Sequence, residues 1–99
     1  MAVYSGDRTI DGISVLVDGK ALDEAVQVHR FSDNGFEWTY EGRESQQLAL
    51  AILHHHLGDA GRALALSERF MQDVIANLDN TWEMSSADVD AFLAEAQTG

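Results

Sequence analysis

The segment Leu48–Leu53 is apolar on nearly every side, and it constrains the fold more than any other part of the chain. A helix that is apolar all round must be surrounded by protein. Ser45 can cap the start of this helix, and Gly58 is well placed to end it. A chain of 99 residues with 45% hydrophobic content can bury one modest core. We therefore predict a single domain, residues 1–99, built around a central helix over residues 45–57.

A second helix is predicted directly after the first. Asp59 can cap a helix over residues 60–78, because its side chain can accept a hydrogen bond from a free amide of the first turn. Apolar residues within this range recur at helical spacing and fill one arc. They are Ala63, Leu64, Leu66, Phe70, Met71, Val74, Ile75 and Leu78.

A third helix is predicted near the C-terminus. Ser85 and Asp88 form an S-x-x-D capping signature, in which each side chain can bond the backbone of the other residue. Met84 and Val89 stand on either side of this cap with the spacing of a hydrophobic staple. Apolar residues then continue at helical spacing as far as Ala96. The C-terminal half is therefore predicted to contain three helices.

The N-terminal part shows the alternation of apolar and polar residues that is typical of strands. The first alternation covers residues 13–17, and Asp18-Gly19 after it favours a tight hairpin turn with a short return strand over residues 20–22. A second alternation covers residues 26–31 and ends in a run of turn-forming residues. We interpret this region as a further hairpin.

Three aromatic residues indicate how the strands meet the helices. Phe36, Trp38 and Tyr40 alternate with polar residues, so one face of a predicted strand carries all three rings. We expect this face to pack against the central helix near Leu50. The predicted fold class is α+β: a small antiparallel sheet of three to five strands in the N-terminal half, packed against three helices in the C-terminal half.

Acidic residues outnumber basic ones seventeen to six, and the formal net charge is −11. Beyond Arg69 there is no Lys or Arg. This charge disfavours direct binding to nucleic acid or to an anionic membrane, and it favours binding to a basic protein. We predict a partner-binding surface made of the acidic residues beyond Arg69, which are Asp73, Asp79, Glu83, Asp88, Asp90 and Glu95.

Residues with catalytic or metal-binding potential are present, but their spacing indicates other roles. His54, His55 and His56 would point about 100° apart on a helix, which disfavours binding of one shared metal ion. The adjacent carboxylates of Asp23 and Glu24 are typical of a solvated surface. The sequence has no phosphate loop, nucleophile elbow or zinc-protease motif. We therefore predict a protein that is not an enzyme and needs no metal or organic cofactor.

The sequence also indicates a cellular location. It contains no cysteine, which fits a reducing cytoplasm. Residues 1–8 are polar and acidic, unlike a secretory signal, and the longest apolar run is far shorter than the roughly 18 to 20 residues that span a bilayer. We predict a cytoplasmic protein that does not enter the membrane, and its oligomeric state is left open.

Several short patterns are spread over almost the whole chain. They are Ile10-Asp11-Gly12, Val15-Leu16-Val17-Asp18-Gly19, Phe36-Glu37-Trp38-Thr39-Tyr40, Gln47–Leu53, His56-Leu57-Gly58-Asp59, Phe70 with Val74, and Trp82 before Met84-Ser85. Together they resemble a family of short uncharacterised proteins from bacteria, archaea and their phages. Members of that family often have a turn with Gly and Pro before the central helix, where this chain has residues 41–46. The resemblance implies a fold and a phage or mobile-element setting, and it transfers no functional residue.

Two functional hypotheses follow from the charge. In the first, the protein is an acidic protein-binding module, for example a phage or mobile-element inhibitor whose carboxylates occupy the basic nucleic-acid-binding site of a host defence protein. In the second, it is a small acidic domain whose charge serves only solvation, as in proteins adapted to high salt. Carboxylates gathered on one face, at the spacing of phosphates along a strand, would favour the first hypothesis.

Overall fold

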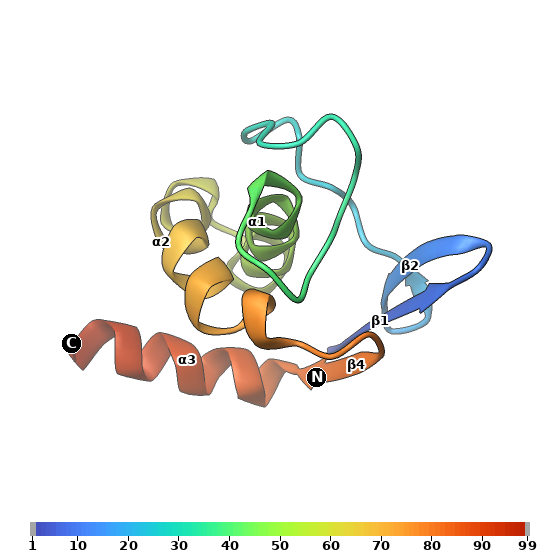
Figure 1. Cartoon of the computed structure of the whole chain (residues 1–99). Coiled ribbons are helices and arrows are strands. Elements are labelled where there is room, and N and C mark those ends of the chain that lie inside the picture. Colours follow the sequence, from blue (N-terminus) through green and yellow to red (C-terminus); the bar gives the residue numbers. More distant parts are fainter. Residues whose placement is uncertain (1, 99) are drawn as a thin grey trace.

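The computed structural model describes residues 2–98, and it has the α+β architecture predicted from the sequence (Figure 1). Its sheet is antiparallel, with the strand order β3-β2-β1-β4. Helices α1 and α2 pack side by side, and α3 runs beside them. In chain order the elements are β1 (Val3–Thr9), β2 (Gly12–Val17), β3 (Lys20–Ala21), α1 (Arg43–Leu57), α2 (Ala60–Asp73), the 3₁₀-helix η1 (Ile75–Asn77), β4 (Trp82–Ser85) and α3 (Ser86–Thr98).

Helix α1 is the central helix of the fold, as predicted. Every residue of Leu48–Leu53 is at most 1% exposed. Gly58 ends the helix in the left-handed conformation, with a φ of 66°, and its amide donates to the His54 carbonyl. The prediction that Ser45 caps the helix was wrong. The N-cap is Gly42, and Ser45 lies buried inside the first turns.

Helix α2 begins as predicted and ends earlier. The Asp59 side chain accepts a hydrogen bond from the Arg62 amide at 3.1 Å, which confirms the cap. The predicted helix extended to residue 78, but α2 ends at Asp73 and is followed by η1. The Asn77 side-chain amide donates to the carbonyls of Gln72 and Asp73. These bonds satisfy carbonyl groups at the end of the helix and account for the break.

Helix α3 has the cap that its sequence predicts. The Ser85 amide donates to the Asp88 carboxylate at 2.9 Å, and the Asp88 amide donates to the Ser85 hydroxyl at 3.3 Å. Met84 and Val89 are both buried beside this cap, as expected of a staple. Ser85 is also the last residue of β4, so the cap joins the sheet directly to α3.

The sheet contains two strands that the sequence did not reveal. Asp18 and Gly19 both have positive φ, which confirms the predicted turn between β2 and β3. Strand β1 pairs with β2 on one side and with β4 on the other. Strand β4 comes from between η1 and α3, so the sheet is not confined to the N-terminal half. Gly6 of β1 lies under the Trp82 indole, where a Cβ would come within 2.3 Å of the indole nitrogen.

Residues 22–42 do not form the predicted strands. The alternation over 26–31 is a turn in which the amides of Val28 and His29 donate to the Ala25 carbonyl. The predicted strand over 36–40 is irregular: its Thr39 amide donates to the Ile75 carbonyl, and Thr39 has a φ of 81°. Hydrogen bonds to helical segments have replaced strand pairing here.

The three aromatic rings of this segment are consequently separated. Trp38 is fully buried, Phe36 is partly buried, and Tyr40 is 44% exposed, so the prediction that all three face the core was wrong for Tyr40. The Trp38 ring meets Trp82 edge to face, with the ring centroids 5.8 Å apart. Both tryptophans thus belong to the core, as expected.

Candidate binding surface

The six acidic residues predicted to bind a partner all lie on the surface. Asp73 is at the end of α2, Asp79 lies in the loop after η1, Glu83 is on β4, and α3 carries the other three. All six residues are exposed: Asp73, Asp79, Glu83, Asp88, Asp90 and Glu95. The structure thus places them on four segments of the C-terminal part, which are α2, the loop after η1, β4 and α3.

The carboxylates of Asp73, Asp88 and Asp90 have contacts within the protein that tie them to local structure. Asp73 pairs with Arg69 at 3.4 Å across one turn of α2. Asp90 lies 2.7 Å from the Nε2 atom of His56 and so links α3 to the end of α1. Asp88 belongs to the cap of α3. Their replacement would therefore change local structure as well as charge.

The solvent face of the sheet adds a carboxylate, Asp7, that lies outside the acidic stretch beyond Arg69. Residues directly opposite in an antiparallel pair point to the same side of the sheet, and Ser5 is opposite Glu83. Asp7 therefore shares this face, and its Oδ1 atom accepts a hydrogen bond from the Thr81 hydroxyl at 2.8 Å. Recognising it required the pairing of β1 with β4, for which the sequence gives no local signal.

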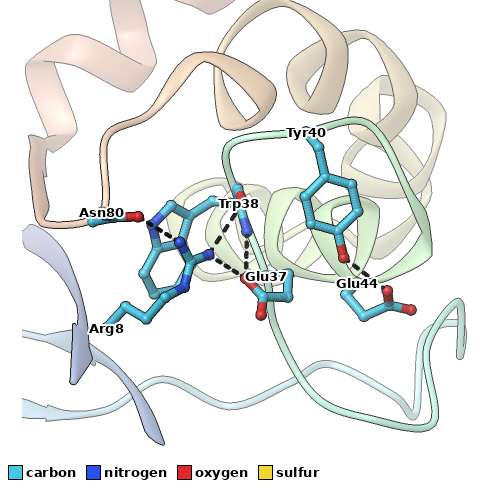
Figure 2. A network of polar contacts seen from close by, with 6 residues as sticks. All are labelled: Arg8, Glu37, Trp38, Tyr40, Glu44 and Asn80. Atoms are coloured by element: carbon cyan, nitrogen blue, oxygen red, sulfur yellow. Dashed lines mark hydrogen bonds and ion pairs between the residues drawn. The ribbon is translucent and has the colours of Figure 1, made fainter. Parts of the chain in front are cut away.

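Arg8 points to the other side of β1 and connects three separate segments (Figure 2). Its guanidinium donates to the Asn80 side-chain oxygen at 2.5 Å, to the Glu37 carboxylate, and to the Trp38 carbonyl at 3.3 Å. It also lies 5.0 Å from the centroid of the Trp38 ring, in cation–π geometry. This network compensates the charge of one of the few cations in the protein.

Tyr40 and Glu44 lie beside this network in Figure 2. The Tyr40 hydroxyl donates to the Glu44 carboxylate at 3.0 Å. Partial burial of the ring and this hydrogen bond raise the pKa of Tyr40. The contact fastens the end of the irregular segment to the first turn of α1.

The three histidines at the end of α1 diverge. His55 shares a 2.8 Å hydrogen bond with the hydroxyl of Tyr4, and His56 contacts Asp90. Burial, with a smaller effect of the Asp18 charge, raises the pKa of Tyr4 to about 12. Among the residues that the structure describes, no group of three metal-ligating side chains occurs.

A cleft of about 390 Å³ lies between β2 and the irregular segment. Ile13 and Val15 line it from one side of β2. Further along the strand, the same side of β2 packs on the core. Residues of the irregular segment form the opposite wall. The full lining is Gly12, Ile13, Val15, Glu24, Asn34, Gly35 and Phe36.

Gln47 of α1 holds the irregular segment in place. Its side-chain oxygen accepts hydrogen bonds from the amides of Phe31 and Ser32, at 2.7 and 3.2 Å. Its side-chain nitrogen donates to the carbonyls of Glu24 and His29, at 2.6 and 3.2 Å. The wall of the cleft is therefore fixed by a fully buried side chain.

A comparison with known protein families shows to which family this chain belongs. Residues 4–95 match a family of unknown function, DUF6166. The chain belongs to this family. The match runs from β1 into α3, so it includes the cleft, the Arg8 network and the six carboxylates. No curated protein and no solved structure matches the chain.

Membership in DUF6166 agrees with the resemblance to an uncharacterised family, and it assigns no role to any residue. Within residues 2–98, no helix has the length and apolar character needed to cross a membrane.

Proposed function

We propose that this member of DUF6166 is a non-enzymatic, acidic protein-binding module whose partner is a basic, nucleic-acid-handling protein. The observation that carries the proposal is the set of six exposed carboxylates on α2, β4, α3 and the loop between η1 and β4, in a part of the chain without Lys or Arg. A phage or mobile-element inhibitor of a host defence protein is the biological setting that we propose.

The internal pairing of the cations supports an acidic field around the molecule. Arg8 pairs with Glu37, Arg30 with Asp33, and Arg69 with Asp73. Even if every cation were paired, the formal charge of −11 would remain on the other carboxylates. Such a field attracts a basic site over roughly 8 to 10 Å at physiological ionic strength, where carboxylates can take the place of phosphates.

The solvation hypothesis is also favoured by a specific observation. Exposed carboxylates occur on other elements as well, including Asp7 on β1, Glu68 on α2 and Glu41 before α1. A charge that serves only solvation would be spread over the molecule in this way. The two hypotheses therefore differ in whether binding of the partner depends on the position of a carboxylate or only on the total charge.

Competition with DNA tests the proposal. Each of a panel of basic nucleases from host defence systems is loaded with a fluorescent DNA duplex, and displacement of the duplex by this protein is followed by anisotropy. We expect this protein to displace the duplex from at least one nuclease. Its affinity for that nuclease should fall steeply between about 50 and 200 mM salt, because screening shortens the reach of the charges.

The test variant is Asp79→Asn with Glu83→Gln. Both residues are exposed and lie outside the cap of α3 and the ion pairs described above. We expect a loss of affinity of about 2- to 30-fold, from two surface charges at the usual strength of exposed pairs. The matched control is Glu41→Gln with Glu68→Gln, which changes the charge equally on other elements. Equal affinities of the two double variants would support solvation, and failure to displace DNA from any nuclease would reject the proposed partner class.

A further inference from the structure

We propose that the cleft between β2 and the irregular segment 22–42 receives an arginine or lysine side chain of the basic partner. This inference rests on the proposed function, because it assigns a specific contact to the same kind of partner. The lining of the cleft, its charge, its size and the rigidity of its wall all fit this occupant.

The apolar part of the lining fits the aliphatic portion of a long basic side chain. Ile13 is 39% exposed although it lies on the core side of β2, because the β1–β2 hairpin extends beyond the helical layer. Val15 is buried deeper along the same strand, and Phe36 contributes a partly buried ring from the opposite wall. Arginine and lysine bury their methylene groups on such surfaces while the charged group stays near water.

The polar part of the lining selects a cation. Glu24 is exposed at the cleft, and within residues 2–98 its carboxylate has no hydrogen-bond or ion-pair partner. Asn34 adds a side-chain amide whose oxygen can accept from a guanidinium or ammonium group. An anionic ligand would face both this carboxylate and the net charge of −11. The charge of the cleft therefore complements a basic group.

The wall that carries Glu24 is preorganised. The Glu24 carbonyl accepts the short hydrogen bond from Gln47, at 2.6 Å, and the adjacent Ala25 is buried with a φ of 57°. A long irregular segment that is held in one conformation in this way is typical of binding loops. Little ordering would then be required when a side chain enters, which lowers the entropic cost of binding.

The size of the cleft distinguishes a side chain from a larger element. Its volume of about 390 Å³ is near the lower end of the range of small-ligand sites, which is roughly 300 to 1,000 Å³. That space fits one extended side chain and the backbone next to it, and it does not fit a helix.

Binding of short peptides, followed by amide chemical shifts of the labelled full-length protein, tests this inference. The probe is a Gly/Ser-rich nonapeptide with one central arginine, and its control replaces that arginine with citrulline, which is neutral and nearly identical in shape. We expect saturable shifts at Gly12, Ile13, Glu24 and Gly35 with the arginine peptide, at concentrations up to ~10 mM. The citrulline peptide should bind more weakly by about 1.4- to 5-fold, since one exposed charge pair is lost.

Two variants locate the contact. Glu24→Gln should weaken binding of the arginine peptide by a similar factor, whereas Glu68→Gln, an equal change of charge on α2, should not. Ile13→Ser tests the apolar floor at a partly exposed position, so the fold should persist, and it should weaken both peptides. Melting temperatures of all variants establish that they are folded.

The outcomes separate this inference from the proposed function. Shifts centred on Asp79 and Glu83, equal binding of the citrulline peptide, or no effect of Glu24→Gln would each overturn the cleft as the site. If DNA displacement from a nuclease persists in that case, the proposed function stands. If displacement fails while the arginine peptide binds in the cleft, the cleft recognises basic side chains but the nuclease partner is wrong. Absence of both peptide shifts and displacement would overturn both proposals.

Discussion

Replacing Gln47 with leucine should destabilise the protein more than any change of similar size on the surface. The leucine side chain fills nearly the same volume in the core, but it cannot form the four hydrogen bonds that the amide makes to the backbone of residues 24–32. The Gln47→Leu variant therefore isolates the contribution of these bonds, with little change in packing.

The loss of unfolding free energy depends on which of the four backbone groups water can reach once the glutamine is replaced. Glu24 and His29 are exposed residues, so water can replace the amide at their carbonyls at little cost. Ser32 is only 2% exposed and Phe31 is partly buried, so their amides lose a partner that water replaces poorly. Each unsatisfied buried group costs about 1 to 3 kcal/mol, and some relaxation of the segment is expected. We therefore expect a loss of about 2 to 4 kcal/mol, a large share of the usual stability of about 5 to 15 kcal/mol.

Urea unfolding followed by tryptophan fluorescence measures this loss, and hydrogen exchange measures protection of the Phe31 and Ser32 amides. Gln46→Leu is the matched control at the next position of α1, where the side chain forms one hydrogen bond, to the Ser67 hydroxyl. It should cost less than about 1.5 kcal/mol. If Gln47→Leu is no more destabilising than Gln46→Leu, or if the two amides stay protected, Gln47 does not hold the segment and the preorganised wall of the cleft must be abandoned.

Three further predictions concern single positions. Gly6→Ala should destabilise the fold by about 1 to 3 kcal/mol, since its Cβ would overlap the buried Trp82 ring. Gly61→Ala in α2 should be neutral or stabilising by about 0.5 kcal/mol. Equal changes of the melting temperature in the two variants would contradict this reasoning. Asp88→Ala should cost about 0.5 to 2 kcal/mol by removing one bond of the α3 cap, measurable by urea unfolding, and an unchanged midpoint would exclude a role for the cap in stability. The pKa of Tyr4 is about 12 in the folded protein against 10.0 for the free side chain, so the unfolded chain releases this proton first. Tyr4 should not affect the free energy of unfolding below about pH 10, and that free energy should fall as the pH rises towards 12. Tyr4→Phe should make this fall less steep. An identical alkaline dependence of unfolding in both proteins would disprove the role of Tyr4.

The helices could be predicted from the sequence because their signals are local. Asp59, Gly58 and the Ser85–Asp88 pair act within one turn of their own helix ends, and the structure contains each of them as predicted. Residues 22–42 could not be predicted in this way. Their aromatic alternation resembles a strand, but the partners of their backbone groups are Gln47, Ile75 and Glu44, which are distant in sequence or belong to a helix.

Strand β1 illustrates why part of the candidate site was missed. Its core side consists of Tyr4, Gly6 and Arg8, of which only the first is a large apolar residue. Gly6 is required by the position of Trp82, and Arg8 by the segments that it connects, so neither produces an apolar alternation. The acidic residues could be named from the sequence alone, whereas the cleft required knowledge of which segments lie opposite β2.

The pairing of β1 with β4 also has a consequence for synthesis of the chain. Residues 3–6 find their partners only at 82–85, and the amide of Ser86 donates to the carbonyl of Ala2 at the end of the same ladder. Residues 1–85 must therefore leave the ribosome before this side of the sheet can close. Until then the nascent chain has an open strand edge at β1 and lacks the ring that covers Gly6. The β1–β4 pairing is thus a late step in formation of the sheet, and deletion of residues 82–99, which removes β4, would leave that edge of β1 open.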